Sequence, residues 1–155
     1  MSATKVTEFL DHNDVGYVSI MHSRVFTAPE VAEFSHVKSR DFAKTVVVKI
    51  DDVMAMVVVP ADRRILLGDL RQWLASESVR LATEAELREA FPDCEVGAMP
   101  PFGNLYGMLV YVASALAEEK EIAFNAGTFS EVIKLAFDDF ERLVRPMIID
   151  FVTAA

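Results

Sequence analysis

The sequence predicts an α+β fold in which helices and strands alternate without a regular βαβ repeat. Two strand-length apolar runs, residues 42–50 and 54–59, are separated by a pair of aspartates, which is typical of an antiparallel hairpin. Capping-box patterns that begin at Thr27 and Thr83 indicate the starts of two helices. The length fits one compact core, so we expect residues 1–155 to form a single domain.

The elements before the hairpin follow from periodicity and from turn residues. Residues 4–13 place apolar side chains at the i, i+3, i+4 spacing of an amphipathic helix. A short extended piece follows at residues 17–21. The capping box at Thr27 then predicts a helix to about His36, and Pro60 ends the second hairpin strand.

The second half alternates shorter elements. Helical spacing predicts helices at residues 67–74, 84–91 and 138–144, and apolar runs predict strands at 79–82, 108–112, 121–124 and 131–135. The tail at residues 147–152 is too apolar to remain in water, so we expect it to pack on its own domain or on a partner subunit.

Composition limits the function classes. The net charge of −9 argues against non-specific affinity for DNA or other phosphate backbones. No apolar stretch reaches membrane-spanning length and no signal-peptide pattern is present, so we expect a cytoplasmic protein that does not bind membranes. Six basic residues either share a mildly positive face or are scattered and solvated: Lys38, Arg40, Lys44, Lys49, Arg63 and Arg64.

The common catalytic and metal-binding templates are missing from the sequence. It contains no serine nucleophile elbow, Walker loop, dinucleotide-binding glycine pattern or HExxH helix. His12, His22 and His36 do not have zinc-ligand spacing, and Cys94 has no cysteine partner, so we expect neither a metal nor another cofactor. Cys94 is interpreted as a small, semi-buried hydrophobe. His22 either has a structural role or lines a cleft.

Two segments allow both a structural and a functional interpretation. Lys44 begins a strongly β-forming run, where it is either a surface charge or a cation directed into a pocket. Residues 97–103 combine glycines with two prolines, which makes a stiff, shaped loop. Such a loop either turns a corner or presents its backbone to a ligand.

Several motifs in a fixed order resemble those of the YbaK/aminoacyl-tRNA synthetase-associated domain family. The resemblance covers roughly residues 17–146. It is carried by Thr27-Ala28-Pro29-Glu30-Val31-Ala32, Phe42-Ala43-Lys44-Thr45-Val46-Val47-Val48, Val79-Arg80-Leu81-Ala82-Thr83, Gly97-Ala98-Met99-Pro100-Pro101-Phe102-Gly103 and Phe124-Asn125-Ala126-Gly127.

The resemblance implies a fold and an activity. The implied fold is a mixed α+β domain with a curved, barrel-like β-sheet flanked by helices. The family comprises trans-editing aminoacyl-tRNA deacylases and editing domains of prolyl-tRNA synthetases, which hydrolyse the ester that joins a wrong amino acid to tRNA. The implied partners are the 3′ end of aminoacyl-tRNA and a prolyl-tRNA synthetase, and we expect a monomer or a weak dimer.

The resemblance also implies the site. Lys44 corresponds to the functional lysine of the family, Gly97 and Pro101 match its GxxxP loop, and Gly127 matches a small-residue turn at the same pocket. Backbone amides near Gly97 or Gly127 are candidate donors to the substrate carbonyl. The expected substrate-binding residues are His22, Thr45, Met99, Pro100, Pro101, Phe102, Asn125 and Phe129.

One position departs from the family pattern. The family often carries a small residue and then a polar one after the turn, whereas this chain reads Thr128-Phe129. A phenylalanine there narrows or closes the pocket, which leaves the edited amino acid open. The first hypothesis is a deacylase for a small amino acid on tRNA for proline. The alternatives are an inactive module that binds tRNA, a synthetase or a small ligand, and an oligomerisation module built on the tail.

Overall fold

The fold combines helices with two main β-sheets. The structure is a computed structural model that describes residues 4–22, 32, 35–150 and 153–154. The helices are α1 (Thr4–His12), α3 (Leu67–Leu74), α4 (Glu84–Ala90), α5 (Ser114–Ala117) and α6 (Phe137–Val144). Most of the helix predicted after Thr27 lies outside the described residues.

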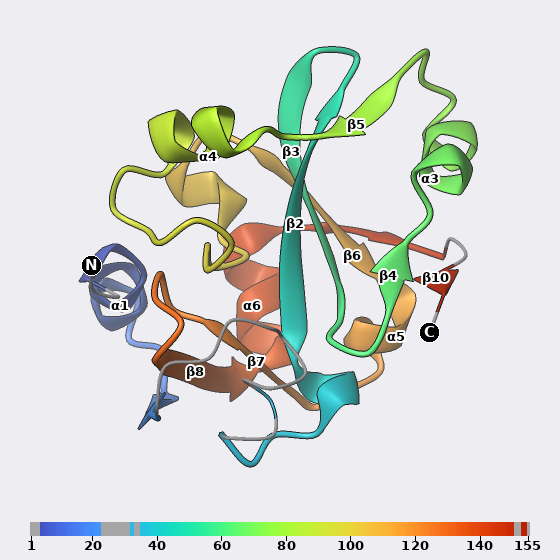
Figure 1. Cartoon of the computed structure of the whole chain (residues 1–155). Helices are drawn as coiled ribbons and strands as arrows, with labels where there is room; N and C mark the ends of the chain where they lie inside the picture. Colours follow the sequence, from blue (N-terminus) through green and yellow to red (C-terminus); the bar gives the residue numbers. More distant parts are fainter. Residues whose placement is uncertain (1–3, 23–31, 33–34, 151–152, 155) are drawn as a thin grey trace.

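The larger sheet has five strands in the order β5-β2-β3-β6-β9. Their bounds are β2 (Ala43–Ile50), β3 (Val53–Pro60), β5 (Val79–Leu81), β6 (Leu109–Ala113) and β9 (Met147–Ile149). β2 is antiparallel to β3 and β5, whereas β6 is parallel to β3 and β9. Figure 1 shows β2 and β3 running through the middle of the molecule, with α4 and α3 on opposite sides of them.

The predicted hairpin of β2 and β3 is confirmed. Asp51 and Asp52 have φ angles of 48° and 69°, the left-handed conformation that a tight two-residue hairpin turn requires. The register runs from Ile50 opposite Val53 to Ala43 opposite Pro60. Because side chains alternate along a strand, this register decides which face of the sheet each β2 residue occupies.

A second sheet lies beside the start of β2. It contains β1 (Tyr17–Met21), β7 (Glu121–Asn125) and β8 (Glu131–Ala136) in the order β1-β8-β7. An isolated parallel bridge between Phe42 and Ala123 connects it to the larger sheet. The α+β class is confirmed, but the strands of the described residues form separate sheets and not one closed barrel. A further two-stranded sheet pairs β4 (Arg64–Ile65) with β10 (Thr153–Ala154).

The main core is rich in aromatic side chains. Phe102 is fully buried, with its ring centroid 5.3 Å from that of Phe124 and 5.5 Å from that of Phe140. Ala43 and Val47 of β2 belong to this core. Val48 belongs to a second cluster on the other face of the sheet, which also includes Val57 and Leu70.

The apolar tail packs on its own domain, in line with one of the two expectations. β9 extends the larger sheet beside β6, and Ile149 is 1% exposed. Met147 and Ile148 stay about half exposed. The sequence does not predict β4, β9, β10 or the short helix α5, because pieces of two to four residues have too little periodicity to be recognised.

The capping box of α4 is confirmed and extends into an ionic cluster. The Thr83 hydroxyl accepts a hydrogen bond from the Glu86 amide, and the Glu86 carboxylate accepts one from the Thr83 amide. The same carboxylate contacts Arg80 at 2.9 Å and Lys49 at 2.7 Å. Glu86 therefore joins α4, β5 and β2 above the edge of the larger sheet.

Replacement of Glu86 with glutamine is expected to lower the melting temperature at neutral pH. Hydrogen bonds from Arg80, Lys49 and the Thr83 amide hold the pKa of Glu86 far below its ordinary range. A carboxylate with a depressed folded-state pKa stabilises the fold above its unfolded pKa, about 4.3, and this contribution is lost as the pH falls below that value. Thermal melts of wild type and variant should therefore converge between about pH 5 and pH 2. A pH-independent difference would contradict this, and Glu89→Gln on the same helix is the control.

Within residues 4–22, 32, 35–150 and 153–154, no helix combines the length and the apolarity needed to cross a bilayer.

Candidate functional site

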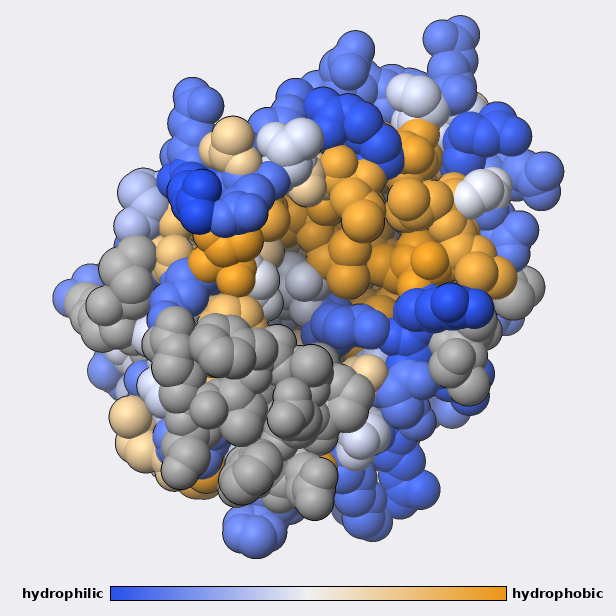
Figure 2. Space-filling view, viewed as in Figure 1, coloured by the Kyte–Doolittle hydropathy of each residue, from blue (hydrophilic) through white to orange (hydrophobic). Residues whose placement is uncertain are grey.

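A cavity of about 620 Å³ lies along the edge of β2 that β5 leaves uncovered. β5 pairs with residues 48–50, and one further hydrogen bond of 3.0 Å joins the Ala82 amide to the Val47 carbonyl. Before Val47, residues of β2 line the cavity. Figure 2 shows a mainly apolar area over β2, β5 and α3, but no residue of α3 lines the cavity, which lies on the side of β2 that faces α4 and the loop after it.

The cavity brings together six of the residues predicted for the site. They come from β2, from the loop after α4 and from the turn between β7 and β8. They are Lys44, Thr45, Gly97, Met99, Asn125 and Phe129. Residues that are 85 positions apart in the sequence, Lys44 and Phe129, thus line one space.

Five other predicted residues are not part of the cavity lining. Phe102 is enclosed in the main core instead of forming a pocket wall, and Pro100 and Pro101 are buried beside it in the chain. His22 follows β1, and its amide donates to the Ser130 carbonyl at 3.0 Å. The Gly127 amide donates to the Ala98 carbonyl at 2.9 Å, so it is already engaged within the protein.

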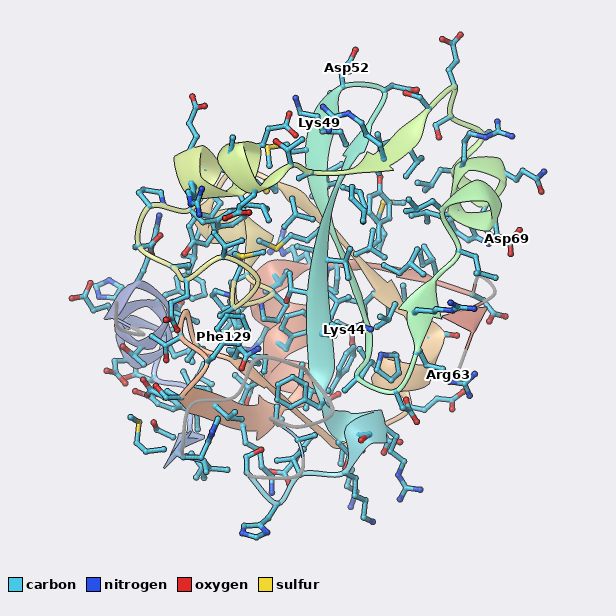
Figure 3. All side chains as sticks on the ribbon, in the orientation of Figure 1. Lys44, Lys49, Asp52, Arg63, Asp69 and Phe129 are labelled. Atoms are coloured by element: carbon cyan, nitrogen blue, oxygen red, sulfur yellow. The ribbon has the colours of Figure 1, made fainter. Side chains whose placement is uncertain are left out.

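The Lys44 side chain extends from β2 toward the turn that precedes β4 (Figure 3), where its ammonium donates a hydrogen bond to the Arg63 carbonyl. Burial lowers the pKa of the Lys44 ammonium, and the nearby Asp62 carboxylate opposes part of this effect. Lys44 is therefore a partly desolvated cation at the cavity, in contrast to a fully solvated surface charge.

Gly97 is required by both backbone conformation and space. Its φ of +92° lies in the left-handed region that favours glycine. A β-carbon at this position would lie 3.2 Å from Cζ of Phe129, closer than an ordinary contact. The Gly97 amide donates to the Met99 sulfur at 3.2 Å, and a thioether is a weak acceptor. This amide can therefore exchange its partner for a stronger acceptor on a ligand.

Phe129 forms a wall of the cavity and does not fill it. Its side chain lies against Gly97, its exposed fraction is 8%, and the cavity beside it keeps about 620 Å³. Of the two expectations, Phe129 therefore does not close the pocket.

Glu95 is a cavity residue that no motif in the sequence marks. Its amide donates to the Gly127 carbonyl at 2.8 Å, and its carboxylate accepts a hydrogen bond of 2.7 Å from the Phe129 amide. The position of Glu95 two residues before Gly97 is the signal that sequence reasoning had available.

Two polar atoms at the cavity have no hydrogen-bond partner among the described residues. They are the Thr45 hydroxyl oxygen and the Asn125 side-chain oxygen, and both are buried. A buried polar atom without a partner costs free energy, so such atoms need a physical reason. At a cavity, water or a ligand can supply the missing hydrogen bonds.

The basic residues do not share one face. Lys49 is bound to Glu86 near the hairpin turn, whereas Lys44 and Arg63 lie toward the other end of β2 (Figure 3). The Ala61 amide donates to the Ser39 carbonyl at 3.1 Å, which brings the segment that carries Arg40 beside the same turn. Lys44, Arg63 and Arg40 therefore gather near one end of β2, together with the carboxylates of Asp62, Asp41 and Glu119.

Cys94 has the environment of a buried hydrophobe. Its exposed fraction is 8%, and burial raises the pKa of its thiol to about 11. A thiol that is protonated at neutral pH is a poor nucleophile, which separates Cys94 from the chemistry of the cavity.

Sequence comparison links the chain to proteins that act on aminoacyl-tRNA. The model of the aminoacyl-tRNA editing domain matches residues 22–143. The multifunctional Ser/Thr-tRNA deacylase ProXp-y of Escherichia coli (strain K12) is 27% identical over 153 residues, which cover 95% of this chain and 90% of the relative. The proline–tRNA ligase of Thermosipho africanus (strain TCF52B) is 34% identical over 79 residues, 51% of this chain and 14% of the ligase.

Solved structures share the fold. A proposed trans-editing enzyme for prolyl-tRNA synthetase superposes with a TM-score of 0.82 at 21% identity, with 96% of this chain and 95% of that chain covered. A hypothetical protein superposes with a TM-score of 0.83 at 20% identity, with 95% and 98% covered.

Proposed function

Because the chain belongs to the aminoacyl-tRNA editing domain family, we propose that it is a deacylase that hydrolyses the ester bond of mischarged tRNA. The observation that carries the proposal is the meeting of Lys44 and Gly97 at one cavity beside the open edge of β2. Water attacks the ester carbonyl carbon, the carbon–oxygen bond to the ribose breaks, and a free amino acid and uncharged tRNA leave.

The proposed roles need little protein machinery. An aminoacyl ester is already activated and the neighbouring ribose hydroxyl assists the attack, so positioning and stabilisation of the oxyanion are the main tasks. The Gly97 amide is the proposed oxyanion donor, since its present acceptor is a weak one. The Lys44 ammonium is the proposed cation for the substrate, and it exchanges the Arg63 carbonyl for a substrate oxygen.

The proposed amino acid is small and carries a hydroxyl group. Phe129 limits the space at the cavity wall, which favours small side chains. The unpartnered oxygens of Thr45 and Asn125 are suited to a substrate hydroxyl, because a site built for hydrogen bonding discriminates against analogues that lack the group. The name of the Escherichia coli relative, a Ser/Thr-tRNA deacylase, supports the same choice.

Replacement of Thr45 with valine is expected to reduce the preference for seryl-tRNA over alanyl-tRNA by about tenfold, the worth of one hydrogen bond. The fold should be as stable or more stable, because a buried hydroxyl without a protein partner is replaced by a methyl group. Single-turnover rates on both substrates, with Thr45→Ser as the control that keeps the hydroxyl, test this. An unchanged preference would remove Thr45 from substrate recognition.

The tRNA is proposed to approach from the Lys44 end of β2. Arg63 belongs to the turn that Lys44 contacts, and Arg64 directly follows it. Arg40, which forms ion pairs with Asp41 and Glu119, lies beside the same turn. At the other end, Lys49 and Arg80 share one ion-pair partner, Glu86. With a net charge of −9, this local basic group supplies only modest affinity for phosphates. A prolyl-tRNA synthetase that presents the mischarged tRNA is therefore the proposed partner.

A deacylation panel tests the proposal. Purified protein is incubated with tRNAs for proline, serine, threonine and alanine that carry matched or mismatched amino acids, and release of labelled amino acid is measured. We expect hydrolysis of one or more small hydroxyl amino acids. Absence of hydrolysis across the panel, with tRNA or synthetase still bound, would instead support the inactive binding module.

A further inference from the structure

The two loops on one side of the cavity are joined by three hydrogen bonds. The Glu95 amide donates to the Gly127 carbonyl at 2.8 Å, and the Gly127 amide donates to the Ala98 carbonyl at 2.9 Å. These backbone bonds align the loops over Glu95–Ala98 and Ala126–Gly127. In the third bond, the Phe129 amide donates to the side-chain carboxylate of Glu95 at 2.7 Å.

The third bond reaches the residue that forms the cavity wall. The turn that carries Phe129 is also held by hydrogen bonds from the Ala126 amide to the Glu131 carbonyl, at 3.1 Å, and from the His22 amide to the Ser130 carbonyl, at 3.0 Å, whereas the bond to Glu95 is made by the Phe129 amide itself. A hydrogen bond to a carboxylate is stronger than one between neutral groups, and this one connects residues 34 positions apart. The Phe129 ring lies against the bare backbone of Gly97, which has no β-carbon to keep the ring away.

We propose that Glu95 is a positioning residue that holds Phe129 at the cavity wall and thereby sets the largest amino acid that the site accepts. The inference rests on the proposed function, since the size limit concerns the amino acid of the tRNA ester. Glu95 acts through Phe129 in this proposal and takes no part in the hydrolysis itself.

The first measurement is amide hydrogen exchange at Phe129 by NMR, which is independent of catalysis. Glu95→Ala removes the acceptor and is expected to accelerate exchange of the Phe129 amide. Glu95→Gln keeps a carbonyl acceptor and is expected to retain most of the protection. Glu89→Ala, an exposed glutamate on α4, is the matched control.

The second measurement is size selectivity. Two hydrolysis-resistant probes, the seryl and leucyl amides of 3′-amino-3′-deoxyadenosine, are titrated and the ratio of their Kd values is compared between variants. Glu95→Ala should weaken the preference for the seryl probe by about tenfold, the order of magnitude of discrimination by pocket size. Glu95→Gln should stay within about threefold of wild type, because the acceptor remains. Phe129→Ala and the double variant with Glu95→Ala should give the same ratio, since both residues act as one unit.

The outcomes separate this inference from the proposed function. The inference would be overturned if the Kd ratio stayed unchanged in Glu95→Ala while the Phe129 amide exchanged faster. It would also be overturned if Glu95→Gln and Glu95→Ala lost the preference for the seryl probe to the same extent. A wild-type protein that discriminates between the probes but deacylates no tRNA would refute the proposed activity, while the Kd ratios still decide the role of Glu95. A wild-type protein that binds neither probe would refute both.

Discussion

Replacement of Lys44 with methionine is expected to reduce kcat/KM for deacylation by about 10²–10³-fold, the usual cost of removing one group that stabilises charge in the transition state. The melting temperature at neutral pH should be unchanged or higher. Burial lowers the pKa of Lys44, which means that the charged ammonium is less stable in the folded state than in the unfolded chain and destabilises the fold. Methionine removes the charge and keeps an unbranched side chain, and the Arg63 carbonyl that loses its partner lies in an exposed hydrogen bond that water can replace.

The pH dependence follows from the same pKa. A lysine whose pKa is lower in the folded state destabilises the fold below the folded pKa, and this cost disappears as the pH rises through the folded pKa toward the unfolded one. Wild type should therefore gain stability relative to Lys44→Met over that alkaline interval. If the ammonium is the working form, wild-type activity should fall at a pH below the value of about 10.4 at which an ordinary lysine loses its proton.

Rates on the tRNA panel and thermal melts of the same samples check this prediction. Lys134→Met, on the exposed side of β8 with only a 3.5 Å ion pair to Glu121, is the matched control. Wild-type rates in Lys44→Met would exclude Lys44 from the mechanism. A large drop in melting temperature would show that its contact with the Arg63 carbonyl supports the fold.

Replacement of Gly97 with alanine is expected to lower the free energy of unfolding by about 1–3 kcal/mol, the cost of a non-glycine residue in a sparsely allowed conformation. The φ of +92° causes part of the cost, and the approach of the new β-carbon to Phe129 at 3.2 Å causes the rest. Activity should fall by about 10²-fold, because a donor displaced by about an ångström no longer fits the transition state.

Gly68→Ala provides the matched control for this glycine. Gly68 lies in the first turn of α3, and a β-carbon there meets nothing within 4 Å. Alanine is the better helix former by about 0.5–1 kcal/mol, so this variant should be equally or more stable, with wild-type activity. Denaturant unfolding and deacylation assays on both variants test the pair. Equal behaviour of Gly97→Ala and Gly68→Ala would refute the requirement for glycine in the loop.

Local patterns predicted most of the longer elements. The hairpin of β2 and β3 and the capped helix α4 each carry their own signal in turn and capping residues. The tail at residues 147–149 was expected only to pack somewhere, because three apolar residues do not specify which strand edge they join. β9 pairs with β6 because the other strands of the sheet leave that edge of β6 free.

The candidate site was likewise predicted in part from local motifs and in part decided by the fold. Motifs identified Lys44, Gly97 and Phe129 as residues of interest, but the same motifs included Phe102, which the aromatic core encloses. Glu95 belongs to no motif and acquires its position from Gly127 and Phe129.

By itself, the sequence determined the fold class, the residues that form the β2–β3 hairpin and the resemblance that selects Lys44, because each of these depends on neighbours in the chain. Only the tertiary structure decided that the edge of β2 lies beside the Gly97 loop, that Phe129 leaves the cavity open and that Glu95 joins the two loops. The physical reason is that these arrangements bring together residues 32 to 85 positions apart in the chain. Their energies depend on distances and burial that exist only after the sheets have packed.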